Sequence, residues 1–352
     1  MQPILTANPV VQAGPAATPI LSVRDLKTYF PLDEGTVRAV DGVSFDVYSG
    51  RTLGIVGESG CGKSITARSI LGIVDRPGRI EGGSVWLRRT RADGSLEEID
   101  LASLPPEGPQ MRAMRGKEIA LVFQEPMASF SHYYTVGNQI VEAIRLHSDA
   151  TKQQAHERAI ELLRMVGVPR PERRVDEYPF QLSGGLRQRV MVAMALACDP
   201  GILIADEPTT ALDVTTQAQV LNLLRDIQAK RGLAVILITH DMGVIAEMAN
   251  DVVVMYLGRA VERGPVDDIF HAPKHPYTRA LLRSIPSITA EPRTKLATIS
   301  GSIPHPFARP KGCPFHPRCA DAIRGICDVH EPKPLQLNER QEVSCFLYGD
   351  RP

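Results

Sequence analysis

Hydrophobic and polar residues alternate through most of residues 21–47, in the stretch LSVRDLKTYF and again in VRAVDGVSFDV. The turn-forming residues Asp33, Glu34 and Gly35 interrupt this alternation. A period of two residues is typical of a β-strand with one buried and one solvated face. The pattern therefore predicts an antiparallel pair of strands near the beginning of the chain.

Four shorter stretches are almost continuously apolar. They are RTLGIVG at 51–57, IALVF at 119–123, ILIAD at 202–206 and LAVILITH at 233–240. Polar or turn-forming residues bound each stretch, and helix-like sequence separates one from the next. Short apolar runs of this kind fit strands that are buried on both faces of a mostly parallel sheet. We therefore expect an α/β domain.

The apolar spacing changes to the helical period between residues 136 and 168. In HERAIELLRMV, for example, Ile160, Leu163 and Val166 would share one face of a helix. The change in period predicts a helical subdomain, at about residues 136–200, within the α/β domain.

Beyond residue 258 the composition changes again. Proline and histidine become frequent, as in HAPKHPY and SIPHPFARPKGCPFHPRC, and long apolar runs disappear. This change predicts a main domain at 20–260 and a small, loop-rich C-terminal domain at 261–352. Residues 1–19 are rich in alanine, proline and valine, which predicts a poorly ordered tail.

Charge and hydropathy narrow the class of protein. Forty basic residues balance forty acidic residues, so no global field would hold the chain to nucleic acid or to an anionic membrane surface. The sequence contains no apolar run of the length that a membrane-spanning helix needs, and its start lacks the pattern of a signal peptide. We expect a cytosolic protein that reaches a membrane only through partner subunits.

Residues 57–64 read GESGCGKS and match the phosphate-loop pattern G-x-x-x-x-G-K-[ST], between a predicted strand and the helical stretch SITARSILGIV. In such a loop the backbone N–H groups surround phosphates, Lys63 would reach the β and γ phosphates, and the Ser64 hydroxyl would ligate Mg²⁺. Cys61 is interpreted as a spacer without chemistry of its own. The residues expected to contact ATP here are Gly57, Glu58, Ser59, Gly60, Cys61, Gly62, Lys63, Ser64 and Ile65.

The buried strand ILIAD ends on Asp206, which Glu207 follows directly. Because neighbouring residues of a strand point in different directions, Asp206 can hold the Mg²⁺ shell while Glu207 faces the attacking water. A salt bridge at the end of the strand is the alternative interpretation. Together with the phosphate loop, this pair indicates only a P-loop NTPase.

Three further features narrow the family. Gln124 follows the strand IALVF, the residues LSGG at 182–185 begin a helical stretch, and His240 ends the strand LAVILITH. With these motifs in order, residues 20–260 resemble the ABC ATPase family. The resemblance implies a P-loop cassette with a mixed sheet core, an antiparallel N-terminal β subdomain and a helical subdomain, here followed by the small cysteine-containing domain.

The same resemblance implies roles for individual residues. Gln124 would sense the γ-phosphate through Mg²⁺ and water, at the place where transmembrane subunits dock. His240 would contact the γ-phosphate and help to hold the attacking water. The amides of the signature residues Ser183, Gly184 and Gly185 would cap the γ-phosphate bound by the opposite subunit.

Two further assignments come from the resemblance. Asp213, in Ala211-Leu212-Asp213, would belong to the D-loop, which communicates across the dimer of ATPase subunits. Phe30, with Tyr29 beside it, would be the aromatic residue that stacks on adenine. The alternative for either ring is packing within the sheet.

Four of the six cysteines, Cys313, Cys319, Cys327 and Cys345, lie close together near the end of the chain. Thiolates suit either Zn²⁺ or an iron–sulfur cluster, and the spacing alone does not choose between them. The residues around them, GCPFHPRC with HPYT upstream at 275–278, resemble the C-terminal region of dipeptide/oligopeptide importer ATPases. That resemblance favours a structural 4Fe-4S cluster over zinc, with four unligated buried cysteines as the remaining alternative.

The resemblance as a whole implies an ATP-hydrolysing subunit of an importer, peripheral to the cytoplasmic face of the inner membrane. Short peptides are its expected cargo, and nickel complexes or oligosaccharides are the alternatives. Its expected partners are two transmembrane permease subunits, a second ATPase subunit, identical or different, and an extracytoplasmic solute-binding protein. A soluble ABC ATPase acting on nucleic acid or ribosomes is the alternative, which the single cassette and zero net charge disfavour. A regulatory protein that no longer hydrolyses ATP is disfavoured by Glu207 and His240.

Overall fold

The computed structural model of the chain describes residues 18–91, 93–210, 212–285, 299–349 and 351. Its strands form two sheets, a four-stranded sheet of order β2-β1-β4-β5 and an eight-stranded sheet of order β11-β12-β10-β9-β3-β8-β7-β6. The predicted N-terminal tail lies almost wholly outside the described residues. The other predicted domain limits stay predictions.

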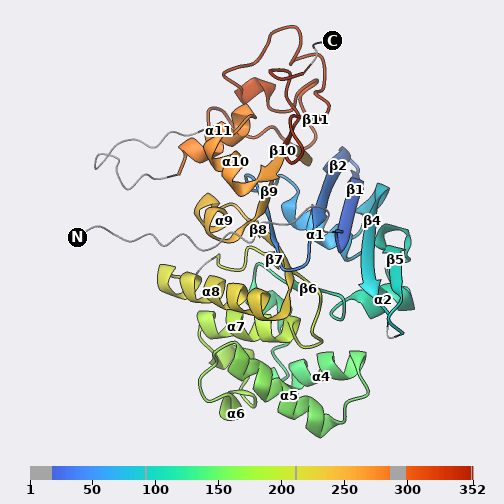
Figure 1. Cartoon of the computed structure of the whole chain (residues 1–352), viewed down its shortest axis with the longest axis vertical. Helices are drawn as coiled ribbons and strands as arrows, with labels where there is room; N and C mark the ends of the chain where they lie inside the picture. Colours follow the sequence, from blue (N-terminus) through green and yellow to red (C-terminus); the bar gives the residue numbers. More distant parts are fainter. Residues whose placement is uncertain (1–17, 92, 211, 286–298, 350, 352) are drawn as a thin grey trace, which may run out of the picture.

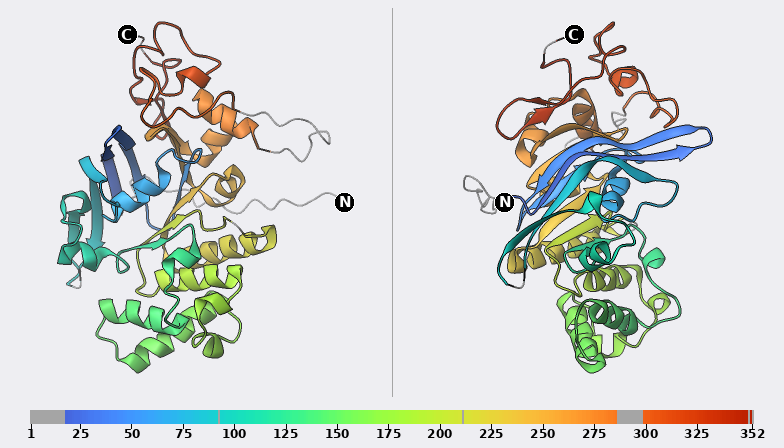
Figure 2. Two further views of the ribbon diagram at one scale, coloured as in Figure 1. Left: turned by 180° about the vertical axis from the view of Figure 1, so that it is seen from behind. Right: turned by 90° about the vertical axis from the view of Figure 1, so that its right-hand side faces the viewer.

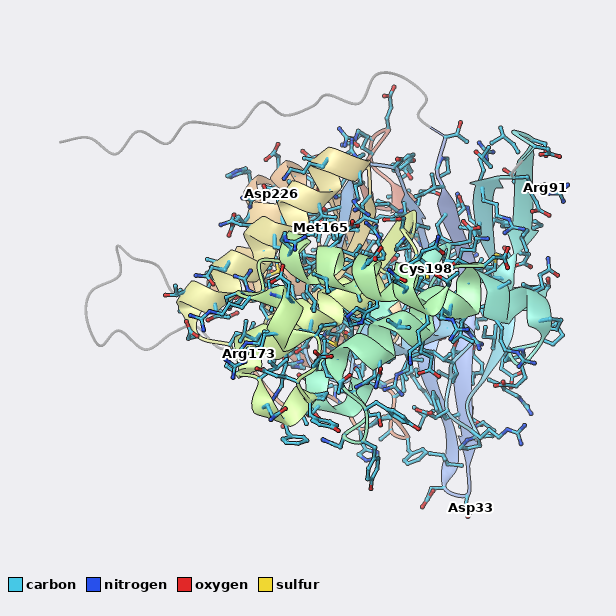
Figure 3. All side chains as sticks on the ribbon, turned by 90° about the horizontal axis from the view of Figure 1, so that it is seen from below. Asp33, Arg91, Met165, Arg173, Cys198 and Asp226 are labelled. Carbon is cyan, nitrogen blue, oxygen red and sulfur yellow. The ribbon has the colours of Figure 1, made fainter. Side chains whose placement is uncertain are left out.

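The four-stranded sheet is antiparallel throughout and forms the side layer drawn in blue and cyan in Figure 1. Its strands are β1 (Leu21–Leu32), β2 (Gly35–Val47), β4 (Arg79–Thr90) and β5 (Leu96–Asp100). Asp33 lies at the far end of the β1–β2 hairpin (Figure 3), where Leu32 pairs with Gly35. The alternating pattern of residues 21–47 therefore predicted this hairpin correctly.

The eight-stranded sheet has a parallel centre and an antiparallel extension. Its parallel strands are β6 (Ile119–Val122), β7 (Ile202–Asp206), β8 (Ala234–Thr239), β3 (Thr52–Val56) and β9 (Asp251–Tyr256). The extension consists of β10 (Arg259–Pro265), β12 (Glu342–Val343) and β11 (Leu335–Gln336). All four apolar runs are strands of the parallel centre, as their composition predicted.

The two faces of this sheet belong to two hydrophobic cores. Along β7, Leu203 and Ala205 face one core, while Ile202 and Ile204 face the other. The antiparallel sheet and α1 (Lys63–Ile70) cover the second core, and the helices shown in yellow and green cover the first (Figure 2). Because both faces are covered, the strands need apolar residues at every position.

The remaining helices follow the chain. The helical part seen at the bottom of Figure 1 is formed chiefly by α4 (Val136–His147), α5 (Lys152–Met165), α6 (Pro171–Arg174) and α7 (Gly184–Ala195). In α5 the buried side chains include Leu162 and Leu163, and Ile160 is only partly buried. The other helices are α2 (Pro109–Met114), α3 (Pro126–Ser129), α8 (Val214–Arg231), α9 (Met242–Met248), α10 (Val266–His271), α11 (Pro276–Arg283), and the 3-10 turns η1 (Leu101–Ser103), η2 (Pro179–Gln181) and η3 (His316–Arg318).

The part of the chain after β9, called the C-terminal region below, is loop-rich, as predicted, and the predicted boundary at 260/261 falls inside β10. It packs on the parallel sheet through an aromatic cluster of Tyr256, Tyr277 and Phe315. The ring centroid of Tyr256 lies 4.7 Å from that of Tyr277 and 5.2 Å from that of Phe315. Within the described residues, no helix is long and apolar enough to cross a membrane.

Candidate nucleotide site

The loop GESGCGKS joins β3 to α1, as the sequence predicted. Lys63 begins α1 and is almost fully buried, and its Nζ donates to the carbonyl oxygens of Gly57, at 2.8 Å, and Glu58, at 3.2 Å. Burial raises the pKa of the Cys61 thiol, which fits its interpretation as a neutral spacer. The lysine side chain therefore lies back along the loop, with its ammonium group bound to the first two carbonyl groups of the loop.

Two glycines of the loop are required by their surroundings. A Cβ atom at Gly57 would lie 2.2 Å from the carbonyl oxygen of Met255, and one at Gly62 would lie 2.1 Å from that of Ala39. Gly62 also has a φ of 101°, a conformation that only glycine adopts readily. The close approach of β2 and β9 to the loop therefore excludes any side chain at these positions.

Asp206 ends β7 beneath the loop. Its Oδ1 atom accepts a hydrogen bond of 3.0 Å from the Ser64 hydroxyl, and its side chain is buried. Burial raises the pKa of Asp206, because little water is present to solvate the ionised carboxylate. A nearby cation would stabilise a buried carboxylate more than one that water already solvates.

Glu207 is the centre of a second set of contacts. Its Oε2 atom accepts from Gln124 Nε2 at 3.2 Å and from the Thr210 hydroxyl at 2.9 Å, and its Oε1 atom lies 3.2 Å from His240 Nδ1. Glu207 is itself buried and has a φ of 48°, which is unusual for a residue other than glycine. Local backbone strain of this kind is concentrated at functional sites.

The sequence placed Gln124, Glu207 and His240 after three different strands, and the structure brings them together. The signal that found them was their position at the carboxyl ends of β6, β7 and β8, which lie side by side in the sheet. Thr210 was not predicted, because a threonine in a turn carries no distinctive pattern.

A pocket of about 490 Å³ lies over the phosphate loop. From the predicted set it is lined by Ser59, Gly60, Gly62, Lys63, Ser64, Ile65, Gln124 and Glu207. The rest of its wall comes from β2, from the turn after β9 and from the C-terminal region, namely Thr36, Val37, Arg38, Ala39, Leu257, Gly258, His305, Pro306, Phe307 and Arg309.

Phe30 is not part of this wall. A Cβ atom at Gly78 would lie 2.4 Å from the Phe30 ring, so the ring packs beside the backbone there, and the Tyr29 hydroxyl donates to Asp41 at 2.7 Å. Among the described residues the aromatic side chain that lines the pocket is Phe307, which is 40% exposed. Sequence reasoning missed it because it lies in the loop-rich C-terminal region.

The signature residues and Asp213 lie elsewhere, outside the pocket lining. Ser183 is the N-cap of α7 and Asp213 is the N-cap of α8, where its carboxylate accepts from the Thr216 N–H at 3.0 Å. Among the residues that the structure describes, no atom of another segment lies within 4 Å of a Cβ atom built on Gly184, so the backbone at the start of α7 is open there. The neighbouring Ala211 lies outside the described residues.

The prediction of a metal site at the four cysteines is wrong. Among the described residues no group of three or more His, Cys, Asp or Glu side chains is placed to hold a metal ion, so neither the 4Fe-4S cluster nor Zn²⁺ is supported. The cysteines are free, and burial raises the pKa of Cys313 to about 12 and that of Cys345 to about 11. A metal ligand is a thiolate, and burial disfavours that charged form at Cys313 and Cys345. Cys313 and Cys319 pack against the larger core as small apolar groups.

Two ion networks join the C-terminal region to the phosphate loop and to β2. Arg318 forms a bidentate pair with Glu58 of the phosphate loop. Arg309 and Arg259 both contact the buried Asp41 of β2, at 2.8 and 3.1 Å. Although burial raises the pKa of Asp41, the Tyr29 hydrogen bond and the two arginines lower it overall.

Comparison with known proteins agrees with this geometry. Residues 40–210 match the family described as ABC transporter, and residues 261–327 match the family described as the C-terminal region of oligopeptide/dipeptide transporters. The dipeptide transport ATP-binding protein DppD of Haemophilus influenzae is 46% identical over 93% of this chain and 94% of its own length. The oligopeptide transport ATP-binding protein AppD of Bacillus subtilis is 48% identical over 94% and 97%.

The chain belongs to the family of dipeptide and oligopeptide transport ATP-binding proteins. Solved structures similar to this family member include a dimeric bacterial ABC transporter cassette, with a TM-score of 0.60 and 25% identity over 70% of this chain and 98% of that one. The same cassette, in a post-hydrolysis state with ADP and phosphate, matches equally well. The fold is therefore that of an ABC ATPase cassette, as predicted.

Proposed function

We propose that this protein binds and hydrolyses ATP and thereby powers the import of dipeptides or oligopeptides through transmembrane partner subunits. One observation carries the proposal. Lys63 of the phosphate loop, the Glu207 carboxylate and Gln124 border a single pocket of about 490 Å³. These groups supply a phosphate cradle, a carboxylate to orient water and a residue that senses the phosphate, which together are what ATP hydrolysis requires.

ATP binding is assigned to the loop and to the pocket wall above it. The N–H groups of the loop and the start of α1 face the phosphates, where a helix N-terminus stabilises negative charge. Lys63 exchanges its carbonyl partners for phosphate oxygens. The adenine base is assigned to Val37 and Phe307, which supply apolar surface to the pocket wall.

The residues near Ser64 fit a magnesium ion. The Ser64 hydroxyl, the Asp206 carboxylate and the side-chain carbonyl of Gln124 are hard oxygen donors, and the buried Asp206 carboxylate accepts a hydrogen bond from Ser64. When bound with ATP, Mg²⁺ neutralises the charge on the phosphate oxygens.

Glu207 is assigned to the hydrolytic step. It orients a water molecule toward the γ-phosphorus, while the bond between that phosphorus and the bridging oxygen of ADP breaks. Gln124, Thr210 and His240 hold the carboxylate in one orientation through the contacts described above. His240, which is 55% exposed, is free to reach the γ-phosphate itself.

The exposed signature residues are assigned to a second subunit. Ser183 and Gly184 lie at an open helix N-terminus and do not line the pocket of their own chain, which supports action on the nucleotide of a partner ATPase. That partner is a second copy or a related chain, with Asp213 near the contact. Two permease subunits and an extracytoplasmic solute-binding protein complete the transporter, and this subunit lies at the cytoplasmic face of the membrane.

The proposal is tested by reconstituting the transporter with two variants. Glu207→Gln keeps the size of the side chain and removes its charge, so ATP should still bind while turnover falls by at least about a hundredfold. Lys63→Ala should weaken ATP binding itself. Normal peptide-stimulated ATP turnover by Glu207→Gln would contradict the assignment of Glu207, and unchanged ATP affinity of Lys63→Ala would contradict the phosphate-loop assignment.

A further inference from the structure

Glu58, the second residue of the phosphate loop, is held by an arginine that lies 260 residues further along the chain. Arg318 Nη1 donates to Glu58 Oε2 at 2.7 Å, and Nη2 donates to Oε1 at 3.0 Å. The Arg318 side chain is only 4% exposed and that of Glu58 is 23% exposed. A bidentate pair with so little exposure fixes the position of the carboxylate much more firmly than a surface pair does.

The backbone of Glu58 is held from the same direction. Its N–H donates to the hydroxyl of Tyr277 at 2.9 Å, and Tyr277 is fully buried in α11. On the opposite side of the residue, the carbonyl oxygen of Glu58 accepts from Lys63 Nζ at 3.2 Å. One residue therefore links the C-terminal region to the lysine that is assigned to the phosphates.

Arg318 is also held by contacts outside the phosphate loop. Its Nε atom donates to the carbonyl oxygen of Ser300 at 3.0 Å, and Nη1 also donates to the Tyr256 hydroxyl at 3.4 Å. Its guanidinium carbon lies 5.8 Å from the centroid of the Tyr256 ring. These three contacts, one with Ser300 and two with Tyr256, restrict the guanidinium group, so it loses little conformational entropy when it binds a carboxylate.

We propose that Arg318 is a positioning residue for nucleotide binding, which holds the phosphate loop through Glu58 and makes ATP affinity depend on the docked C-terminal region. The inference rests on the proposed function, since it concerns the same pocket. Arg318 acts in two ways. It keeps the loop backbone in place beside Lys63, and it neutralises a carboxylate that would otherwise repel phosphates.

The experiment measures the dissociation constant of Mg-ATP for the purified full-length chain, with thermal unfolding in parallel. Arg318→Ala should raise the dissociation constant about tenfold, because Glu58 is left without its cation. Arg318→Lys keeps the charge and loses the bidentate geometry, so a rise of about threefold is expected. Glu58→Gln in the Arg318→Ala background removes the unpaired charge and should restore part of the affinity.

Arg263→Ala is the matched control. Arg263 pairs with Glu342 at 3.0 Å and joins β10 to β12, within the same region and away from the phosphate loop. It should lower the melting temperature without changing ATP affinity. In the reconstituted transporter, Arg318→Ala should raise KM for ATP more than it lowers kcat, a split that general destabilisation does not produce.

Three results would overturn the proposal. Arg318→Ala could bind ATP as tightly as the wild type, Arg263→Ala could weaken binding equally, or the added Glu58→Gln change could restore nothing. If Arg318→Ala does not fold, Arg318→Lys decides, and wild-type affinity in that variant would overturn the inference. A wild-type chain that does not bind ATP would contradict the proposed function itself, which separates the two failures.

Discussion

Replacing Gly62 by alanine should damage the phosphate loop far more than the same change two residues earlier. Both glycines have positive φ, 79° at Gly60 and 101° at Gly62. The surroundings differ, because within the described part of the chain a Cβ at Gly60 meets nothing within 4 Å, whereas one at Gly62 lies 2.1 Å from the Ala39 carbonyl oxygen. The pair therefore separates the cost of backbone conformation from the cost of a steric clash.

The expected magnitudes follow from those contacts. A left-handed conformation costs an alanine about 1–2 kcal/mol relative to glycine, which is the whole effect expected at Gly60. At Gly62 either β2 or the loop must also move by about 1 Å, and overpacking of this kind costs about 1–3 kcal/mol more. Gly62→Ala should therefore lower the free energy of unfolding by about 2–5 kcal/mol, which is about 1–3 kcal/mol more than Gly60→Ala.

The assay is equilibrium urea unfolding of the nucleotide-free chain, so that a methyl group at Gly60 meets only solvent. Unfolding free energies of the two variants that agree within about 0.5 kcal/mol would refute the reasoning. That result would mean that β2 does not restrict the loop at Gly62. Nucleotide binding, measured separately, should be lost in Gly62→Ala, because the loop cannot keep its shape beside Ala39.

Two further predictions concern other parts of the site, and a third concerns His275, the N-cap of α11. Thr210→Val removes a 2.9 Å hydrogen bond to the Glu207 carboxylate, so kcat for ATP should fall about tenfold while ATP affinity stays unchanged. Phe307→Ala removes apolar surface from the pocket wall, so the dissociation constant of ATP should rise about fivefold, as equilibrium titration would show. Burial lowers the pKa of His275 from the usual 6.5 to about 3, so the unfolded chain binds a proton more readily than the folded chain does. The free energy of unfolding should therefore fall as pH decreases from 6.5 toward 3. His275→Asn, which can still cap α11 but takes up no proton, should reduce the slope of unfolding free energy against pH by about 1.4 kcal/mol per unit.

The grouping of Gln124, Glu207 and His240 was predictable from the sequence because the topology of the sheet fixes where strand ends lie. A parallel sheet carries the ends of its strands to one edge, so residues that follow β6, β7 and β8 converge whatever their separation in sequence. Gln124, Glu207 and His240 each follow an apolar run whose length and composition identify a strand. Their contacts with one another follow from that placement.

The C-terminal side of the site was not predictable in the same way. Phe307 and Arg318 lie among loops without periodicity, so the sequence gives no register that would bring them to β2 or to the phosphate loop. Strands β4 and β5 were also missed, since glycines at 82 and 83 interrupt the alternation of β4. At the cysteine cluster the sequence predicted a site that the structure does not support. The residue type suggested a metal site, whereas burial of the thiols depends on packing that the spacing of the cysteines does not specify.

The pairing of β10 with β9 determines how the molecule can be divided. Ala260 pairs with Met255 and Gly264 with Val252, so the last part of the chain begins as the next strand of the central sheet. A chain cut at residue 260 would expose the backbone N–H and C=O groups along one side of β9, whose residues 252–256 are apolar and buried. Such an edge recruits strands from other molecules, so a shortened protein should aggregate. The two parts of the chain therefore share one sheet and form a single structural unit.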